Sequence, residues 1–284
     1  SWFDWIPGTV DPTAVAIYDD GVLQAQAIGI ELAPSRVEEL TLRRARNERL
    51  FRGLVVPTAS VAEFIGLDMD RVIVGGNGTV ASRVRPGPWP AVPAIGIASG
   101  AAPGRGIEAL IEAARMLRST VPELRLYLWL AGTSASGDAY VEGLRAETAG
   151  EPWVEIGRAP YERLGETLAA ASVLAIPSPA TEYSDVALPV KLFDYMAVGR
   201  PQVVTPRREA AELVTRYRVG SVAGGDDAVS LAAALAPFLT DEALAREVGA
   251  RARETAEHQF DWPIVGDRIA DAILRREGIP VRAR

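Results

Sequence analysis

The sequence predicts an α/β protein of two domains, the second of which is a parallel sheet with helices on both faces. The chain has 284 residues, whereas one domain typically takes roughly 100–200. Residues 85–93 (RPGPWPAVP) are dense in proline and divide the chain. Beyond them, short apolar runs alternate with amphipathic helical runs, which is the pattern of strands and helices in a parallel sheet.

Residues 1–85 are expected to form part of the first domain. We expect three strands there, at residues 13–18, 53–57 and 71–74. A charged helical pattern covers 35–52, and a second helix is expected from 58 to 65. Three strands are few for an independent domain of this type, whose sheets have about 5–6. Because the chain also begins with Ser1 instead of methionine, we expect this domain to be incomplete and the natural start to lie upstream.

Residues 86–93 are expected to form a stiff linker between the two domains. The prolines at 86, 88, 90 and 93 disfavour a helix or a central strand, because each fixes φ and lacks an N–H. An ordinary long loop is the alternative, but the density of proline favours a domain boundary.

Residues 94–261 are expected to form the second domain, and an amphipathic segment follows at 262–275. The expected strands lie at 94–98, 124–131, 153–156, 173–177 and 202–205. The expected helices lie near 107–117, 138–148, 164–171, 207–216, 226–239 and 241–257. Ligands of open parallel sheets bind at the carboxyl ends of the strands. We therefore expect a site in the loops that follow these strands.

Composition argues against several classes of function. The net charge is −7, whereas general binding of nucleic acids needs a basic surface. Without cysteine there is no thiol nucleophile and no zinc–thiolate site. His258 is the only histidine and favours a structural role, so we expect no metal site. No run approaches the roughly 18 apolar residues of a membrane span.

The stretch over residues 181–204 (TEYSDVALPVKLFDYMAVGRPQVV) predicts a loop, a short helix and a new strand. Pro189 suits the first turn of that helix, where its missing N–H costs nothing. The apolar residues of the helix share one face, and they are Leu192, Phe193, Met196 and Ala197. Gly199 is expected to end the helix, and Pro201 prevents its resumption.

Lys191 lies in the first turn of this helix, where the helix dipole disfavours a cation by roughly 0.3–1 kcal/mol. An anion bound between Lys191 and the helix N-terminus would remove that conflict. Asp194 follows one turn later on the same side, and its carboxylate would suit the hydroxyls of a ribose. These residues indicate a nucleoside diphosphate site, and the alternative is an exposed ion pair between Lys191 and Asp194.

Glycine-containing loops follow the strands that end near residues 98, 131 and 156. Glycine lets backbone N–H groups approach a phosphate closely, and Arg105 lies just before a helix, within reach of such a phosphate. Tight-turn geometry is the alternative reason for each glycine. Residues 99–106 match neither G-x-G-x-x-G nor G-x-x-x-x-G-K-[ST]. The absence of both motifs argues against an NAD-binding protein and against a P-loop NTPase.

Several segments together resemble the retaining glycosyltransferases of family 4, which have the GT-B fold of two Rossmann-like domains. These segments are Arg105-Gly106 with residues 107–114, YLWLAG at 127–132, VEIG at 154–157, ASVLAIPS at 171–178, LPVKLFDYMAVGRPQVV at 188–204 and FDW at 260–262. The run at 188–204 is the most specific, and VVPTAS and VIVGGNGTV in the first domain are weaker matches. The resemblance implies an acceptor-side domain over 1–85, a donor domain over 94–261, and a helix over 262–284 that crosses back to the first domain.

In that family the second domain binds a nucleoside-diphosphate sugar. The resemblance implies that Arg105 and Lys191 hold the diphosphate and stabilise its charge during catalysis. Asp194 occupies the second carboxylate position of the family's motif and would bind the ribose. The first carboxylate position is Val186 here, so Asp185, as a catalytic residue, or Glu182, as a donor contact, would substitute for it.

The remaining donor contacts that the resemblance implies lie in loops, and they are Gly100, Gly132, Gly157, Arg158, Leu188 and Val190. The backbone around Gly157 and Arg158 would meet the base. The main chain of residues 188–190 would meet the phosphates and the sugar. Gly100 stands where many members of the family carry arginine, and the histidine that is usual in their first domain is missing here.

The resemblance therefore implies a bacterial-type enzyme that moves a sugar, with retention, from a nucleoside-diphosphate sugar to a sugar, lipid or small-molecule acceptor in glycan or glycoconjugate biosynthesis. It implies no cofactor, no nucleic-acid partner and a cytoplasmic protein, with peripheral contact at the inner face of a membrane. One alternative is a non-catalytic subunit that binds nucleotide sugars. The other is a non-hydrolysing nucleotide-sugar epimerase, which would need acid–base carboxylates or histidines in its cleft.

Overall fold

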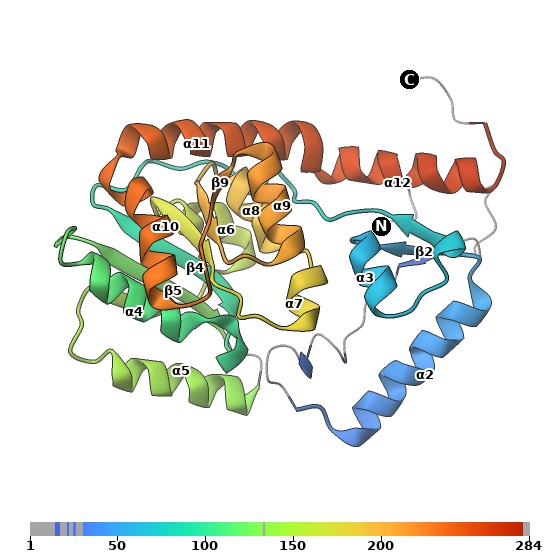
Figure 1. Ribbon diagram of the computed structural model, residues 1–284, viewed down its shortest axis with the longest axis horizontal. Coiled ribbons are helices and arrows are strands. Elements are labelled where there is room, and N and C mark those ends of the chain that lie inside the picture. The colour runs from blue at the N-terminus through green and yellow to red at the C-terminus, as the bar shows by residue number, and fades with distance from the viewer. Residues whose placement is uncertain (1–14, 18–21, 23–24, 27–30, 133, 281–284) are drawn as a thin grey trace.

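The computed structural model describes residues 15–17, 22, 25–26, 31–132 and 134–280, and within them it has two sheets (Figure 1). The smaller sheet has the strand order β1-β2-β3, and the larger has the order β6-β5-β4-β7-β8-β9. Every strand pair in both sheets is parallel. The predicted α/β class is confirmed.

The smaller sheet consists of β1 (Val15–Ile17), β2 (Gly53–Val56) and β3 (Val72–Val74). The helix α2 (Pro34–Leu50) precedes β2, α3 (Ala59–Phe64) follows it, and a short 3-10 turn, Met69–Arg71, leads into β3. All four residues of β2 are buried, because β2 is the central strand and side chains alternate between its two faces.

The larger sheet consists of β4 (Ala94–Gly100), β5 (Arg125–Ala131), β6 (Val154–Gly157), β7 (Val173–Ile176), β8 (Gln202–Val204) and β9 (Gly220–Val222). The five strands expected here all form. The sequence analysis missed β9, because its three residues carry no apolar run. Gly220 is required there, since a Cβ at this position would lie 1.8 Å from the carbonyl oxygen of Gln202.

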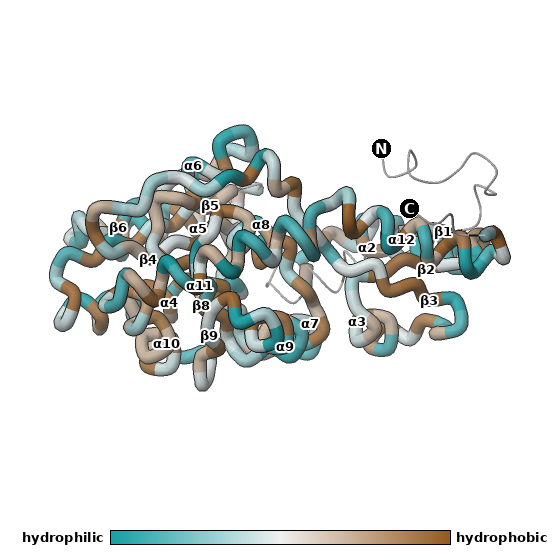
Figure 2. Tube along the Cα trace, turned by 90° about the horizontal axis from the view of Figure 1, so that it is seen from above, coloured by the Kyte–Doolittle hydropathy of each residue, from teal (hydrophilic) through white to brown (hydrophobic). Residues whose placement is uncertain are grey.

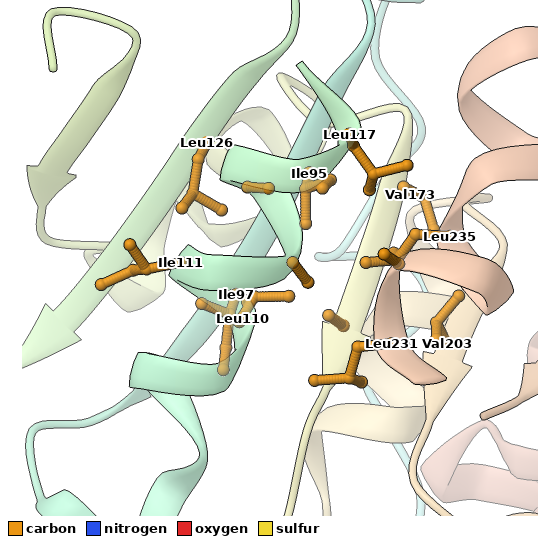
Figure 3. Packing of buried hydrophobic residues seen from close by; sticks show 14 of the residues in the cluster. Ile95, Ile97, Leu110, Ile111, Leu117, Leu126, Val173, Val203, Leu231 and Leu235 are labelled. Carbon is orange, nitrogen blue, oxygen red and sulfur yellow. The ribbon is translucent and has the colours of Figure 1, made fainter. Parts of the chain in front are cut away.

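Helices cover both faces of the larger sheet, as expected. They are α4 (Ile107–Leu117), α5 (Ala135–Glu147) and α10 (Ala228–Thr240) on one face, and α6 (Leu164–Leu168), α8 (Lys191–Ala197) and α9 (Arg208–Tyr217) on the other. Figure 3 shows Ile95 and Ile97 of β4 packed against Leu110 of α4, with Leu231 and Leu235 of α10 alongside. The helix α11 (Glu242–Thr255) packs on α8 and contributes side chains to both clusters.

Two details of the stretch 181–204 differ from expectation. The segment expected to be a loop contains a short helix, α7 (Glu182–Val186), whose N-terminus is closed by a capping box between Thr181 and Ser184. The next helix, α8, begins at Lys191 and not at Pro189. The carbonyl of Pro189 instead accepts a hydrogen bond from the Leu192 N–H at 3.1 Å. Lys191 is nevertheless in the first turn.

The chain passes between the two halves twice, in the segment after β3 and in the segment before residue 262, and these two segments cross at Thr79. The Thr79 N–H donates to the carbonyl of Phe260, and the Trp262 N–H donates to the carbonyl of Thr79, both at 2.9 Å. Beyond this crossing, α12 (Trp262–Arg276) runs over the smaller sheet (Figure 1). Its buried residues Val265, Ile269 and Ile273 pack against Val55 of β2 and Ile73 of β3. Figure 2 shows the apolar strands β2 and β3 beside α12.

The proline-rich segment lies against the larger half of the molecule through Arg200. This side chain is only 2% exposed, and its nitrogens donate to the carbonyls of Ala169, Ala171 and Pro88 at 2.7–2.8 Å. The guanidinium also stacks over the ring of Trp89, 4.4 Å from its centre. A buried arginine with several carbonyl partners therefore fixes the path of the chain here.

No single helix among the described residues is long and apolar enough to cross a membrane, although the pair 228–240 and 242–260, bent by 99°, passes that test of length and composition when taken together.

The α8–α11 contact generates a stability prediction. In the interior of α11, a Cβ on Gly249 would lie 2.3 Å from the carbonyl oxygen of Gly199, so the backbone at the end of α8 would have to move. We expect Gly249→Ala to lower the free energy of unfolding by about 1–3 kcal/mol, as overpacking does. The matched control is Gly143→Ala inside α5, where nothing lies within 4 Å.

That control should stabilise the protein by about 0.5–1 kcal/mol, because alanine is the better helix former. Urea denaturation of both variants measures the difference. Equal effects of the two substitutions would show that α8 and α11 do not pack at this distance.

Candidate functional site

The larger sheet divides where β4 and β7 part, and we call the region between the carboxyl ends of these two strands the crevice. The two strands pair only at Ile95–Val173 and Gly96–Leu174, although β4 continues to Gly100. The order of strands also reverses here, since β5 and β6 lie on one side of β4 while β7, β8 and β9 lie on the other. Ligands of open α/β sheets bind at such a reversal, outside the carboxyl ends of the strands.

Tyr195 of α8 fills the gap behind the crevice. Its hydroxyl accepts a hydrogen bond from the Ala98 N–H at 2.8 Å and lies 3.3 Å from the Ala98 carbonyl oxygen, to which it donates. These are the two backbone groups of β4 that β7 no longer reaches. Tyr195 is fully buried, and burial raises the pKa of its phenol, which keeps the hydroxyl protonated as a donor.

Arg105 reaches the crevice from the loop after β4. Gly106, the next residue, has φ +70°, and a Cβ there would lie 1.8 Å from the carbonyl oxygen of Pro177, so only glycine lets this loop cross the end of β7. The Arg105 guanidinium lies over the end of β4, with Nη2 3.9 Å from the position of a Cβ on Gly100. Its buried Nε has no hydrogen-bond partner in the described part of the chain. Burial lowers the pKa of Arg105, while Tyr183 of α7 acts in the opposite direction.

Lys191, the only lysine of the sequence, enters the same crevice from α8. Its Nζ donates to the Ser99 hydroxyl at 3.0 Å. Burial, and then the charge of Arg105, lower the pKa of Lys191 to about 7. Within the described part of the chain, neither Lys191 nor Arg105 forms an ion pair with a carboxylate. The crevice therefore holds two mutually repelling cations that lack a counter-anion.

Asp194, one turn after Lys191, accepts a hydrogen bond from the Thr79 hydroxyl, with 2.7 Å between Oγ1 and Oδ1. Burial raises the pKa of this carboxyl group, and the Thr79 hydrogen bond opposes that rise. The alternative ion pair between Lys191 and Asp194 is not formed among the described residues, since Lys191 is bonded to Ser99 instead. The conflict between Lys191 and the helix dipole thus remains without an anion.

The loop between α7 and α8 is fastened to the smaller half of the molecule. The Asn77 Nδ2 donates to the carbonyl of Leu188 at 2.8 Å, and the Thr58 hydroxyl donates to the carbonyl of Val186 at 3.0 Å. The Val186 side chain is buried among Leu54, Val56 and other apolar residues. The Leu188 carbonyl is therefore already engaged, and the Val190 side chain is exposed.

The two carboxylates proposed to replace the one missing at 186 lie on α7. Glu182 is exposed, and it forms no ion pair that the described residues show. Asp185 is half-exposed and forms an ion pair with Arg207, 3.3 Å from Nη1 to Oδ1. The Arg207 side chain is 11% exposed, and its buried Nε has no hydrogen-bond partner among the described residues. Asp185 is therefore held by a cation, whereas Glu182 faces solvent.

Gly132, Gly157 and Arg158 come together in a separate pocket at the carboxyl ends of β5 and β6. This pocket has a volume of about 270 Å³ and is also lined by Leu130, Asp138, Val141, Glu142 and Arg145. A Cβ on Gly132 would lie 2.1 Å from Asp138 Oδ1, so a larger residue here would displace the Asp138 side chain. Arg105, Lys191 and Asp194 do not line the pocket. The predicted residues thus form two groups at the same edge of the sheet.

Sequence reasoning missed the residues that hold the predicted ones. Ser99, Thr79 and Arg207 are the partners of Lys191, Asp194 and Asp185. The only available signal was the Asn77-Gly78-Thr79 turn, which was noted as a weak resemblance. Hydroxyl partners carry no spacing pattern, so their pairing becomes visible only in three dimensions.

The family model described as glycosyl transferases group 1 matches residues 93–241, which is just over half of the chain. Among curated proteins, the chain is 28% identical over 201 residues to the GDP-mannose-dependent monoacylated alpha-(1-6)-phosphatidylinositol monomannoside mannosyltransferase of Corynebacterium glutamicum, with 69% of this chain and 51% of that protein covered. It is also 28% identical over 284 aligned positions to WcaL of Escherichia coli, whose name assigns it to colanic acid biosynthesis, with 94% and 68% covered. The chain thus spans about half the length of the first relative and about two thirds of the second.

Solved structures show the same fold at low identity. Sucrose-phosphate synthase of Thermosynechococcus elongatus superposes with a TM-score of 0.71 at 19% identity, with 95% of this chain and 69% of that chain covered. HepE of Anabaena, solved with UDP and glucose, superposes with a TM-score of 0.70 at 20% identity, with 91% and 70% covered. The fold is therefore GT-B, as the resemblance implied.

The crevice generates a prediction about Tyr195. Tyr195→Phe removes the hydroxyl and leaves two half-buried backbone groups of Ala98 without this partner. We expect a loss of about 1–3 kcal/mol in the free energy of unfolding, the usual cost of an unpaired buried polar group. Tyr127→Phe is the control, because the Tyr127 hydroxyl has no hydrogen bond within the described residues and its ring stacks on Trp129. Urea denaturation should show almost no change in the free energy of unfolding for that control. An equally small change for Tyr195→Phe would refute the role of the Tyr195 hydroxyl as the partner of Ala98.

Proposed function

Since this chain belongs to the glycosyl transferases group 1 family, we propose that it binds a nucleoside-diphosphate sugar in the crevice and transfers the sugar to the hydroxyl of an acceptor. The observation that carries the proposal is the pair of cations, Arg105 and Lys191, that meet in the crevice without a carboxylate partner among the residues that the structure describes. A diphosphate would supply the missing anion and bind two charge-assisted donors. The HepE structures with UDP and with UDP-glucose support a donor of this class.

In the proposed binding mode, the diphosphate lies between Arg105 and Lys191. Asp194 accepts from the ribose hydroxyls, and the base occupies the pocket that Gly157 and Arg158 line. The sugar points towards α7, where Arg207 holds Asp185. The donor itself brings the leaving group, and in this proposal Arg105 and Lys191 supply the positive charge that stabilises it.

The proposed transfer breaks the bond between the anomeric carbon and the phosphate oxygen while the acceptor oxygen bonds to the same carbon. Negative charge develops on the leaving diphosphate, where Arg105 and Lys191 stabilise it. The leaving phosphate oxygen takes the proton of the acceptor hydroxyl. This route attacks from the side that the leaving group vacates, retains the anomeric configuration, and needs no histidine base.

A non-catalytic nucleotide-sugar-binding chain is the second candidate, and Val186 is the observation that favours it. The position where the family carries its first carboxylate is here buried in an apolar cluster with Leu54 and Val56. A donor that binds but is neither transferred nor hydrolysed, tested with the full-length protein and a broad set of acceptors, would support this candidate. Release of the nucleoside diphosphate that depends on an acceptor would exclude it.

The proposal predicts different ligand losses for two variants. Lys191→Ala should weaken the binding of UDP or GDP by about 1.5–3 kcal/mol, the range for a hydrogen bond to a charged group. It should leave uridine or guanosine unaffected, because the ammonium pairs with phosphate. Asp194→Asn should weaken nucleoside and nucleoside diphosphate alike. Calorimetry measures all of these, and unchanged affinities in both folded variants would refute the donor site.

The pKa of Lys191 predicts how binding depends on pH. A lysine with a pKa of about 7 is mostly neutral above that pH, whereas a bound diphosphate favours the charged form and raises the pKa. Binding must then take up a proton, so affinity should fall by up to about tenfold per pH unit above 7. Because Lys191 is the only lysine, lysine labelled with ¹³C gives a single Cε resonance to titrate. A midpoint near the ordinary value of about 10.4 in the free protein would contradict this prediction.

A further inference from the structure

The place where the two halves of the molecule are joined also touches the proposed donor site. Thr79 forms an isolated parallel bridge with Asp261 at the crossing of the two connecting segments. The Asp261 carboxylate accepts from the Ala81 N–H at 3.1 Å. A Cβ on Gly78 would lie 2.6 Å from the carbonyl oxygen of Phe260, so the segments approach as closely as glycine allows. The backbone of Thr79 is therefore fixed on both sides.

The side chain of Thr79 points from this fixed backbone to the larger half. Thr79 is 2% exposed, and its hydroxyl donates to Asp194 Oδ1 at 2.7 Å across 115 positions of sequence. Asp194 lies on α8, one turn from Lys191 and next to Tyr195. A hydrogen bond to one carboxylate oxygen fixes the plane of the carboxylate and leaves the second oxygen for a ligand.

We infer that Thr79 is a positioning residue, whose hydroxyl orients the Asp194 carboxylate towards the ribose hydroxyls and ties that contact to the crossing between the two halves. This inference rests on the proposed function, because it takes Asp194 to contact the ribose. It goes further in making recognition of the nucleoside depend on a residue outside the donor domain. A carboxylate without this donor would be free to rotate and would be held less well for two hydroxyls.

Two other side chains join the halves in the same region, and each bonds to a backbone carbonyl across the join. Thr58 donates to Val186 and Asn77 donates to Leu188. Thr58 is buried to a similar extent as Thr79, at 5% exposure. Thr58→Val is therefore a control that removes a buried hydroxyl between the halves without touching Asp194. It also removes the N-cap of α3, where the Thr58 hydroxyl accepts from the Val61 N–H at 3.1 Å.

The test compares Thr79→Val, Thr79→Ser and Thr58→Val by calorimetry against UDP, uridine and inorganic pyrophosphate, with GDP and guanosine in place of the uracil pair if the wild type prefers guanine. We expect Thr79→Val to weaken the nucleoside and the nucleoside diphosphate by about tenfold, the size of one hydrogen bond to a charged group. Pyrophosphate should bind as in the wild type. Thr79→Ser should restore affinity to within about twofold, and Thr58→Val should leave the nucleoside unaffected.

The outcomes separate the inference from the proposed function. Unchanged nucleoside affinity in Thr79→Val, together with a loss in Asp194→Asn, overturns the inference and leaves the donor site standing. Unchanged affinity in Asp194→Asn overturns the ribose contact and the inference with it. An equal loss of pyrophosphate and nucleoside in Thr79→Val shows a general structural role and also overturns the inference. If Thr79→Val does not fold, Thr79→Cys, a similar volume with a weak donor, is judged by the same criteria.

Discussion

The hydroxyl of Tyr195 makes the crevice possible. When β4 and β7 part after Gly96, the Ala98 N–H and carbonyl lose the strand that would have paired them, and buried backbone groups need partners. Tyr195 supplies both partners from α8. The same contact fixes the height of α8 beside β4, and therefore brings Lys191 within 3.0 Å of Ser99. The contact of Tyr195 with Ala98 therefore both pairs the exposed end of β4 and positions Lys191.

The crevice is electrostatically unfavourable in the absence of an anion. Burial already disfavours the charged forms of Arg105 and Lys191, and the charge of Arg105 lowers the pKa of Lys191 further. Folding must offset this cost, and the clusters on the two faces of the larger sheet are where the apolar burial lies. A bound anion would relieve this repulsion, so the cost in stability and the proposed affinity for a diphosphate have the same origin.

The sequence allowed prediction of the larger sheet, its helices and the conflict at Lys191, because those depend on periodicity and on position within a helix. The partners were not predictable. Thr79 and Asp194 lie 115 positions apart, and Lys191 and Ser99 lie 92 apart, so only the folded chain brings them together. The helix α7 was missed because five residues are too short to show a period, and its capping box has Ser184 in place of the usual acidic or amide residue.

Val186 shows how the balance of charge in the crevice follows from packing. The side chain is 5% exposed and joins Leu54 and Val56 of the smaller half, so a carboxylate there would be buried in apolar surroundings at a large cost. Glu182 faces solvent, while the two nearby aspartates have other partners, since Asp185 pairs with Arg207 and one oxygen of Asp194 accepts from Thr79. With Val186 uncharged and both aspartates engaged, the charges of Arg105 and Lys191 stay uncompensated. An apolar contact between the halves therefore leaves the crevice cationic, which is the condition that binding a doubly charged diphosphate requires.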